Sequence, residues 1–291
     1  MIGNSSIEAL VQLIDDPDEL IYEHVRGQLL SIGSPALPFL ESPWDKRYNQ
    51  FLFQSRVETI IREIQFEEIK MQIKFWLDSP EKDLLDGAII IAKYANPDLD
   101  EDFVKKRIEN IRRDIWLELN DNQTAFEQIK IFNSVFFGVH GFQGDLQNFL
   151  DPDYSLIDEV LLSKKGNPLS LSLIYSYIAQ SLELPIFGVN LPNHFILAFM
   201  DENKSRFFIN QHNEFGVLFY INVFAKGQLL DLQNIEDFLT ENNLTKNREC
   251  YEPCSHSTII KRMISNLIVS YQRMGFGTKV QELLVIRELF D

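Results

Sequence analysis

Residues 166–195 combine two features that nucleophilic chemistry requires, a helix N-terminus and a histidine. Gly166-Asn167-Pro168 leads into an apolar helical pattern, and Leu191-Pro192-Asn193 leads into His194. A thiol at a helix N-terminus has a lowered pKa because the helix dipole and free N–H groups stabilise the thiolate, and a histidine can accept its proton. Such a pair would perform acyl transfer. Here Pro168 occupies the first helical position and has no group to ionise, so the nucleophile is missing.

Two serines one turn further along offer hydroxyl groups instead. Ser170 and Ser172 follow Pro168 within the same helical pattern. A serine hydroxyl gains little from a helix dipole, so Ser170 would need His194 within hydrogen-bond reach as a general base. The other interpretation is that both are ordinary helix residues whose hydroxyls bond to backbone carbonyls. His194 likewise has two interpretations, a functional base or a buried structural histidine.

The third group of such a site would orient the histidine. If the strand ending at Met200 pairs with one beginning at Arg206, His194 lies opposite His212, and Asn210 lies on the same face. Asn210 then has the orienting role. A slip of one residue would move these side chains to opposite faces, so the expectation depends on the register. The predicted binding cleft contains Pro168, Ser170, Asn193, His194, Asn210 and His212.

A metal site is not predicted. Cys250, Cys254 and His256 form the pattern C-x3-C-x-H, which is one ligand short of a tetrahedral zinc site, and no second cysteine pair exists. The spaced glycines between Gly138 and Gly144 lack the lysine and the preceding strand of a phosphate-binding loop. We therefore expect no cofactor and no metal, and we expect both cysteines to be unbridged.

Composition limits the classes of partner. The chain has 291 residues with a formal net charge of −16, and 45% of its residues are hydrophobic. A surface this acidic repels phosphate backbones and anionic lipid, so we expect neither nucleic acid nor membrane as a partner. The chain begins without a positively charged segment and has no apolar run of the ~20 residues that a membrane span needs. These observations predict a cytoplasmic protein.

The central third of the chain contains the strand patterns. Asn167 suits an N-cap, and apolar residues then recur at helical spacing up to Leu182. Segments 186–190, 194–200 and 206–210 are rich in branched and aromatic residues and read as strands. The predicted fold class is α+β, with this helix packed against an antiparallel sheet.

Helices are predicted on both sides of this core. Residues 1–120 are expected to form a helical region in which one helix pair, closed by Gly33-Ser34-Pro35, resembles a single HEAT-type repeat. Residues 121–245 form the predicted core. Residues 246–291 contain two helical patterns joined by Gly275-Phe276-Gly277 and resemble one tetratricopeptide-type hairpin. We expect both helical ends to pack against the core, because each is too short to bury its own apolar face.

Several motifs resemble a known family. Gly141-Phe142-Gln143-Gly144-Asp145, Gly166-Asn167-Pro168-Leu169-Ser170-Leu171, Leu191-Pro192-Asn193-His194-Phe195 and Phe208-Ile209-Asn210 are similar to motifs of the bacterial SirB-type family, in the transglutaminase-like, papain-fold clan. The resemblance covers most of the chain. It implies a transglutaminase-like core behind a helical N-terminal region, with a tetratricopeptide-like tail. It places Pro168 where active members of the clan keep their cysteine, His194 on the clan's histidine, and Asn210 near its acidic third residue.

Two functions remain open at this point. The first is a non-catalytic transglutaminase-like protein that acts as a protein-binding or regulatory module, with an unknown protein partner bound through its helical ends. The second is a hydrolase or acyl transferase that uses Ser170 and His194. Pro168 at the thiol position favours the first.

Overall fold

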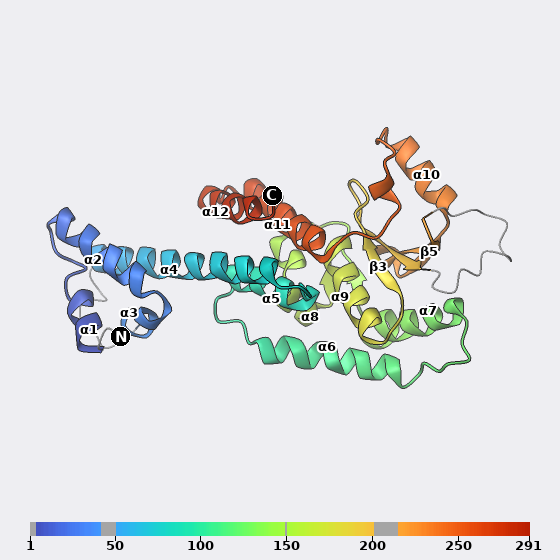
Figure 1. Cartoon of the computed structure of the whole chain (residues 1–291), viewed down its shortest axis with the longest axis horizontal. Helices are drawn as coiled ribbons and strands as arrows, with labels where there is room; N and C mark the ends of the chain where they lie inside the picture. The colour runs from blue at the N-terminus through green and yellow to red at the C-terminus, as the bar shows by residue number, and fades with distance from the viewer. Residues whose placement is uncertain (1–3, 42–50, 149, 201–214) are drawn as a thin grey trace. The chain divides into compact units, whose positions relative to one another are not determined.

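The computed structural model describes residues 4–41, 51–148, 150–200 and 215–291. The chain divides into two compact units, Met1–Phe75 and Trp76–Asp291. Figure 1 shows the mixed helical and strand content, and the structure is of the α+β class. The predicted strand 206–210 lies outside the described residues.

The first unit is helical. Its elements are α1 (Asn4–Val11), α2 (Glu19–Ile32), the short η1 (Ser34–Ala36), α3 (Leu37–Leu40) and most of α4 (Phe51–Asp78). Asp18 caps α2 by accepting a hydrogen bond from the amide of Leu20, and Gly33 ends it with φ of 72°. Leu29, Val57 and Ile60 are fully buried in its core. Apolar residues at helical spacing on α4 therefore complete a core that the shorter helices could not form alone.

The second unit is built around one buried helix, α9 (Pro168–Ser181). All residues from Leu169 to Ser176 are buried, which explains the nearly continuous apolar and small-residue sequence of this helix. It packs on the sheet through β3 and β4, and it also contacts α5, α6, α8 and α11. These helices are α5 (Leu84–Ala95), α6 (Glu101–Trp116), α8 (Ile157–Ser163) and α11 (His256–Met274).

A four-stranded antiparallel sheet forms the strand layer, in the order β3-β4-β5-β6. The strands are β3 (Ile186–Val189), β4 (Ile196–Met200), β5 (Val217–Asn222) and β6 (Gln228–Leu230). Helix α10 (Leu232–Glu241) follows β6, and Ile235 and Leu239 of α10 pack into the cluster that contains Tyr220. The sheet is therefore covered by α9 and by the apolar face of α10.

The pairing of β4 differs from the sequence-based expectation. Both edges of β4 are occupied, by β3 and by β5, with Leu197 opposite Ile221 and Met200 opposite Val217. The partner that follows β4 is therefore Val217–Asn222 rather than the segment from Arg206 that the sequence analysis chose. The expectation failed because strand partners are chosen by long-range packing, and two similar segments compete here.

The second unit contains eight further elements within the described residues. They are α7 (Ala125–Asn133), η3 (Ser134–Val139), β1 (Gln143–Gly144), η4 (Pro152–Ser155), β2 (Lys165–Gly166), η5 (Val223–Ala225), η6 (Arg248–Cys250) and α12 (Gly277–Glu288). The two-residue strands β1 and β2 pair in parallel. Helices α11 and α12 form a hairpin in which α11 contacts α9 and α5, so this C-terminal pair packs on the core of its unit.

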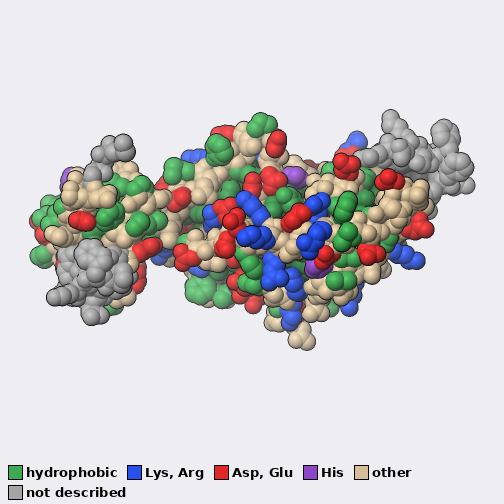
Figure 2. Space-filling model, turned by 90° about the horizontal axis from the view of Figure 1, so that it is seen from below, with side chains coloured by type: hydrophobic (Ala, Val, Ile, Leu, Met, Phe, Trp, Pro, Cys, Tyr) green, Lys and Arg blue, Asp and Glu red, His purple; other side chains and the backbone are tan. Residues whose placement is uncertain are grey.

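Figure 2 shows lysines and arginines gathered near the middle of the face that it draws, with acidic side chains between and around them. Helix α6 contributes five lysines and arginines, and several are neutralised locally. Lys105 lies 3.1 Å from Glu101, and Arg112 lies 2.6 Å from Glu109. Within the described ranges, no helix is long and apolar enough to cross a bilayer.

Candidate functional site

The N-terminus of α9 is closed by a capping box. The side-chain oxygen of Asn167 accepts hydrogen bonds from the amides of Leu169 and Ser170, at 3.0 and 2.9 Å. Pro168 follows the cap, where its missing N–H costs nothing. The side-chain nitrogen of Asn167 donates to the Ser155 hydroxyl at 2.8 Å. The helix start therefore has the predicted position, and its amide groups serve the cap.

Ser170 belongs to this cap and does not have the bonding of a nucleophile. Its hydroxyl donates to the carbonyl of Tyr154 at 2.6 Å and accepts from the amide of Asn167 at 3.0 Å. Only 5% of Ser170 is exposed. An activated serine donates its proton to a base, whereas this proton goes to a backbone carbonyl. Ser172 is fully buried, and its hydroxyl has no hydrogen-bond partner among the residues that the structure describes.

His194 is the last residue of a tight turn. The carbonyl of Leu191 accepts from the backbone N–H of His194 at 3.1 Å. Pro192 is the second residue of this turn, and Asn193 has φ of 59°, which is the pattern of a type II turn. His194 is thus in the turn, two residues before β4 begins, and not in the strand as predicted. Its side chain is partly exposed.

The helix start and the turn lie at the same end of the unit. Only residues 182–185 connect α9 to β3, and the Gln180 side chain bonds to the carbonyl of Ile186 at 2.9 Å. The helix therefore runs antiparallel to β3, and its N-terminus points to the end at which β3 finishes. His194 follows that end of β3 by five residues.

Asn222 is the side chain that bonds to His194, at the end of β5. Burial lowers the pKa of His194 below its ordinary value of 6.5, the bond to Asn222 opposes this shift, and the positive charge of Arg262 adds to it. The ring of Phe238 lies 6.0 Å from the imidazole, between centroids. The amide oxygen of Asn222 also accepts from the amide of Ala225 at 3.2 Å, which fixes its orientation.

Sequence reasoning missed Asn222, although the signal was present. Phe208-Ile209-Asn210 and Tyr220-Ile221-Asn222 are nearly the same tripeptide twelve residues apart, and the first was chosen. Asn210 and His212 lie outside the described residues, so the structure does not test their expected positions. In the described part of the chain, the side chain that bonds to His194 is that of Asn222.

The residues of the C-x3-C-x-H pattern, Cys250, Cys254 and His256, do not form a common site, and Cys250 and His256 bond to different partners. The thiol of Cys250 bonds to the side chain of Asn247 at 3.0 Å, and the His256 ring nitrogen bonds to the carbonyl of Lys82 at 2.9 Å. Cys250 and Cys254 are both free. The described residues contain no group of three or more side chains placed to hold a metal ion.

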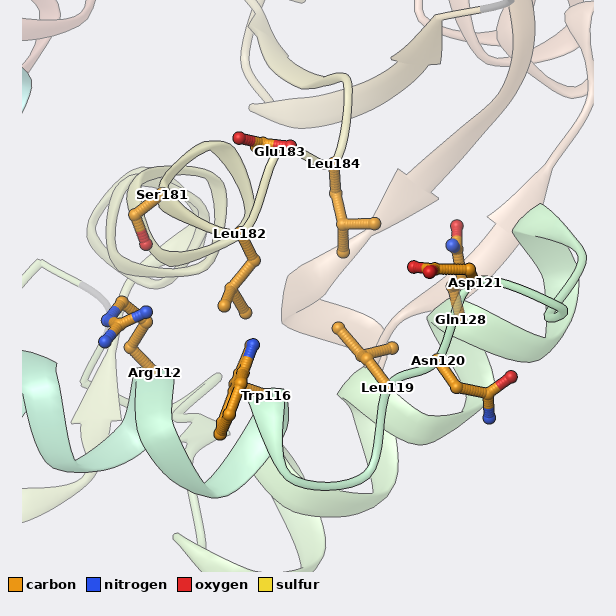
Figure 3. Close-up of a pocket in the computed structure, with 10 residues that line it drawn as sticks. All are labelled: Arg112, Trp116, Leu119, Asn120, Asp121, Gln128, Ser181, Leu182, Glu183 and Leu184. Atoms are coloured by element: carbon orange, nitrogen blue, oxygen red, sulfur yellow. The ribbon is translucent and has the colours of Figure 1, made fainter.

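A surface hollow of about 360 Å³ lies at the opposite end of α9. Figure 3 shows Trp116 facing Leu182, and Leu119 facing Leu184, with Asp121 and Gln128 at one side. This hollow contains none of the predicted site residues.

The lowered pKa of His194 predicts a pH-dependent stability. The unfolded chain binds the proton more readily than the folded chain, so the stability contributed by neutral His194 is present above pH 6.5 and is lost as the pH falls through the folded pKa. Denaturant unfolding at about pH 7.5 and about pH 5 should therefore show a smaller loss of stability for His194→Asn than for the wild type.

A second histidine affects this comparison. Burial also lowers the pKa of His140, so this residue changes the stability in the same direction. The comparison is therefore repeated in a His140→Asn background. An equal loss of stability with and without His194 in that background would contradict the prediction.

The mixed helix and sheet content is consistent with a match to a known family. A family model described as the transglutaminase-like superfamily matches residues 102–265, more than half of the chain. The chain belongs to this superfamily. The matched region begins in α6 and ends in α11, so it contains α9, the sheet, His194 and Asn222.

Individual relatives are distant. A UPF0162 protein of Vibrio cholerae is 25% identical over 136 residues, 47% of this chain and 50% of that protein. F-box only protein 21 of Pongo abelii is 23% identical over 256 residues, 80% of this chain and 40% of that protein. A UPF0162 protein of Xylella fastidiosa is 23% identical over 197 residues, 66% of each chain. The chain thus spans 40–66% of the length of these relatives. No solved structure matches it.

Proposed function

We propose that this chain is a non-catalytic transglutaminase-like protein that acts as a protein-binding or regulatory module. The observation that carries the proposal is the start of α9. Pro168 stands at the first helical position, and the hydroxyl of Ser170, two residues further along, donates to the carbonyl of Tyr154. The histidine and its asparagine partner remain, so the site can bind a ligand through polar groups without forming a covalent intermediate.

The alternative, a hydrolase or acyl transferase using Ser170 and His194, requires a different hydrogen bond. Ser170 would have to give up its bond to Tyr154 and leave a buried carbonyl unpaired, which costs about 1–3 kcal/mol. It would also lose the bond that it accepts from the Asn167 amide, and the capping box would open. No contact of Ser170 in the described residues favours this alternative.

The finer parts of the proposal concern the subfamily and the partner surfaces. The motifs that resemble the SirB-type family support that assignment, and the α11–α12 hairpin supports a tetratricopeptide-like tail. A HEAT-like helix pair within α1–α3 is also part of the proposal, and the helix pair that Gly33-Ser34-Pro35 closes supports it. Exposed apolar side chains support partner binding at the helical ends. They include Phe51, Met71 and Phe75 on α4, which are 89%, 64% and 80% exposed, Met274 at the end of α11, and Phe276 just before α12.

An activity-based probe screen tests the absence of chemistry. We expect fluorophosphonate and iodoacetamide probes to leave residues 168–172 of the native protein unlabelled, and amine incorporation into glutamine substrates to stay at background. His194→Ala should behave in the same way. Labelling of Ser170 that disappears in His194→Ala would show that the protein is an enzyme and would refute the proposal.

A further inference from the structure

Arg262, on α11, has one edge of its guanidinium occupied. Its Nη1 atom donates to the side-chain oxygen of Asn190 at 2.6 Å and to the carbonyl of Leu191 at 3.3 Å. These two bonds use both hydrogens of Nη1. The Nε and Nη2 atoms donate to no residue in the described part of the chain. Within the described residues, three N–H groups are therefore left without an acceptor, and two of them, one on Nε and one on Nη2, lie on the same edge of the guanidinium.

The charge of Arg262 has no counter-charge among the described residues. Other arginines of the chain are paired: Arg26, Arg112 and Arg248 each contact a carboxylate within 2.8 Å. The ionisable group beside Arg262 is the thiol of Cys254, and burial raises the pKa of this thiol to about 11. Cys254 is thus neutral at neutral pH. Because Arg262 is itself partly buried, an unpaired charge here costs more than it would at the surface.

Arg262 is also next to the candidate site. The carbonyl of Leu191 accepts hydrogen bonds from both Arg262 and the backbone N–H of His194. The guanidinium therefore contacts the turn that carries the imidazole, and its charge acts on the ring. A fixed guanidinium edge and the imidazole therefore lie at one end of the sheet. The N–H of the neutral ring is used in the bond to Asn222, and the second ring nitrogen becomes a donor when the ring is protonated.

We propose that Arg262 and His194 bind a carboxylate group of the ligand, with Asn190 holding the guanidinium in place. This proposal rests on the proposed function, a site that binds without turnover. The Nε and Nη2 edge of an arginine matches the two oxygens of a carboxylate. One positive charge beside a neutral imidazole suits a single negative charge better than a phosphate dianion. For a protein partner, the group is a chain terminus or an acidic side chain.

Proton NMR of the His194 ring, in the full-length protein, measures this binding. N-acetylglycine serves as the probe, N-acetylglycinamide as its uncharged counterpart, and inorganic phosphate as the competing anion. We expect N-acetylglycine to shift the ring signals saturably and to raise the pKa of His194, since a bound anion favours the imidazolium. The amide should cause no saturable shift, and phosphate should bind at least about 10-fold more weakly than N-acetylglycine.

Variants separate charge from geometry. Arg262→Gln should weaken N-acetylglycine binding at least about 10-fold, and Arg262→Lys should weaken it less, because lysine keeps the charge but loses the planar edge. Arg112→Gln is the matched control, since Arg112 is paired with Glu109 on α6, and it should bind as the wild type does. Thermal unfolding verifies that each variant is folded, and Arg262→Lys provides the test if Arg262→Gln is not.

Three results would overturn the carboxylate site. They are equal binding by the wild type and a folded Arg262 variant, equal binding of the acid and its amide, and tighter binding of phosphate. Failure of the proposed function is a different result, the His194-dependent labelling of Ser170. That labelling can occur with or without carboxylate binding, so the two proposals are tested separately.

Discussion

Replacing Pro168 by cysteine will create a reactive thiol at a position where the wild type has none. The pKa of a thiol at a helix N-terminus is lowered from about 8.5 into the range of about 3.5–7.5. At pH 7 and a pKa of about 7, roughly half of it is thiolate, against about 3% for an ordinary cysteine. Pro168→Cys should therefore be alkylated by iodoacetamide at least about 10-fold faster than an ordinary exposed thiol.

The same helix supplies the matched control. Ser181 is exposed and is the last residue of α9, where the helix dipole disfavours a thiolate. Ser181→Cys should therefore react no faster than an ordinary cysteine. The native Cys254 provides a lower reference, because burial raises its pKa to about 11. Only about one part in 10,000 of this thiol is ionised at pH 7.

A second substitution tests whether His194 acts on the introduced thiol. His194→Ala, added to Pro168→Cys, should slow the alkylation if His194 reaches the thiol, because the neutral imidazole can take the thiol proton and the resulting imidazolium stabilises the thiolate. Peptide mapping by mass spectrometry measures the labelling at each position. Equal rates at positions 168 and 181 would mean that the start of α9 does not activate a nucleophile. The argument that Pro168 alone removes the chemistry would then be wrong.

Local sequence signals were sufficient for the elements around the site. Asn167 and Pro168 fixed the start of α9 to within one residue, because capping and the missing proline N–H act within one helical turn. The strands at 186–189 and 196–200 followed from branched and aromatic residues. His194 was placed near the edge of a strand for the same reason, although Pro192 and the φ of Asn193 put it in a turn.

The pairings between distant segments were not predictable in the same way. Asn222 reaches His194 only because β5 pairs with β4, and the nearly identical tripeptide ending at Asn210 gave a competing choice. Arg262 lies 68 residues after His194 along the chain, and nothing in its local sequence indicates that it contacts the Leu191 carbonyl. Such contacts depend on how α11 packs against the core, which no local pattern encodes.

Gly227→Ala is expected to lower the free energy of unfolding by about 3–5 kcal/mol. Gly227 has φ of 74°, and an added Cβ would lie 2.2–2.4 Å from the side-chain amide of Asn133. That amide donates to the carbonyl of Gly227 at 3.1 Å and accepts from the hydroxyl of Tyr175 at 3.0 Å. Moving Asn133 would leave the hydroxyl of the buried Tyr175 unpaired, which costs about 1–3 kcal/mol beyond the backbone strain.

Gly275→Ala is the matched control for the backbone strain. Gly275 has φ of 77°, and an added Cβ there meets no atom within 4 Å. Gly275→Ala should therefore cost only about 1–2 kcal/mol, the penalty of an L-residue in the left-handed region.

Because the backbone amide of Gly227 donates to the carbonyl of Asn222 at 2.9 Å, Gly227→Ala should also disturb the bond between Asn222 and His194. Urea denaturation measures the stabilities, and NMR titration of His194 detects the local change. Equal destabilisation by Gly227→Ala and Gly275→Ala would show that the Asn133 side chain can move away at little cost in free energy. Its bonds to Gly227 and Tyr175 would then not hold the turn after Asn222 in place.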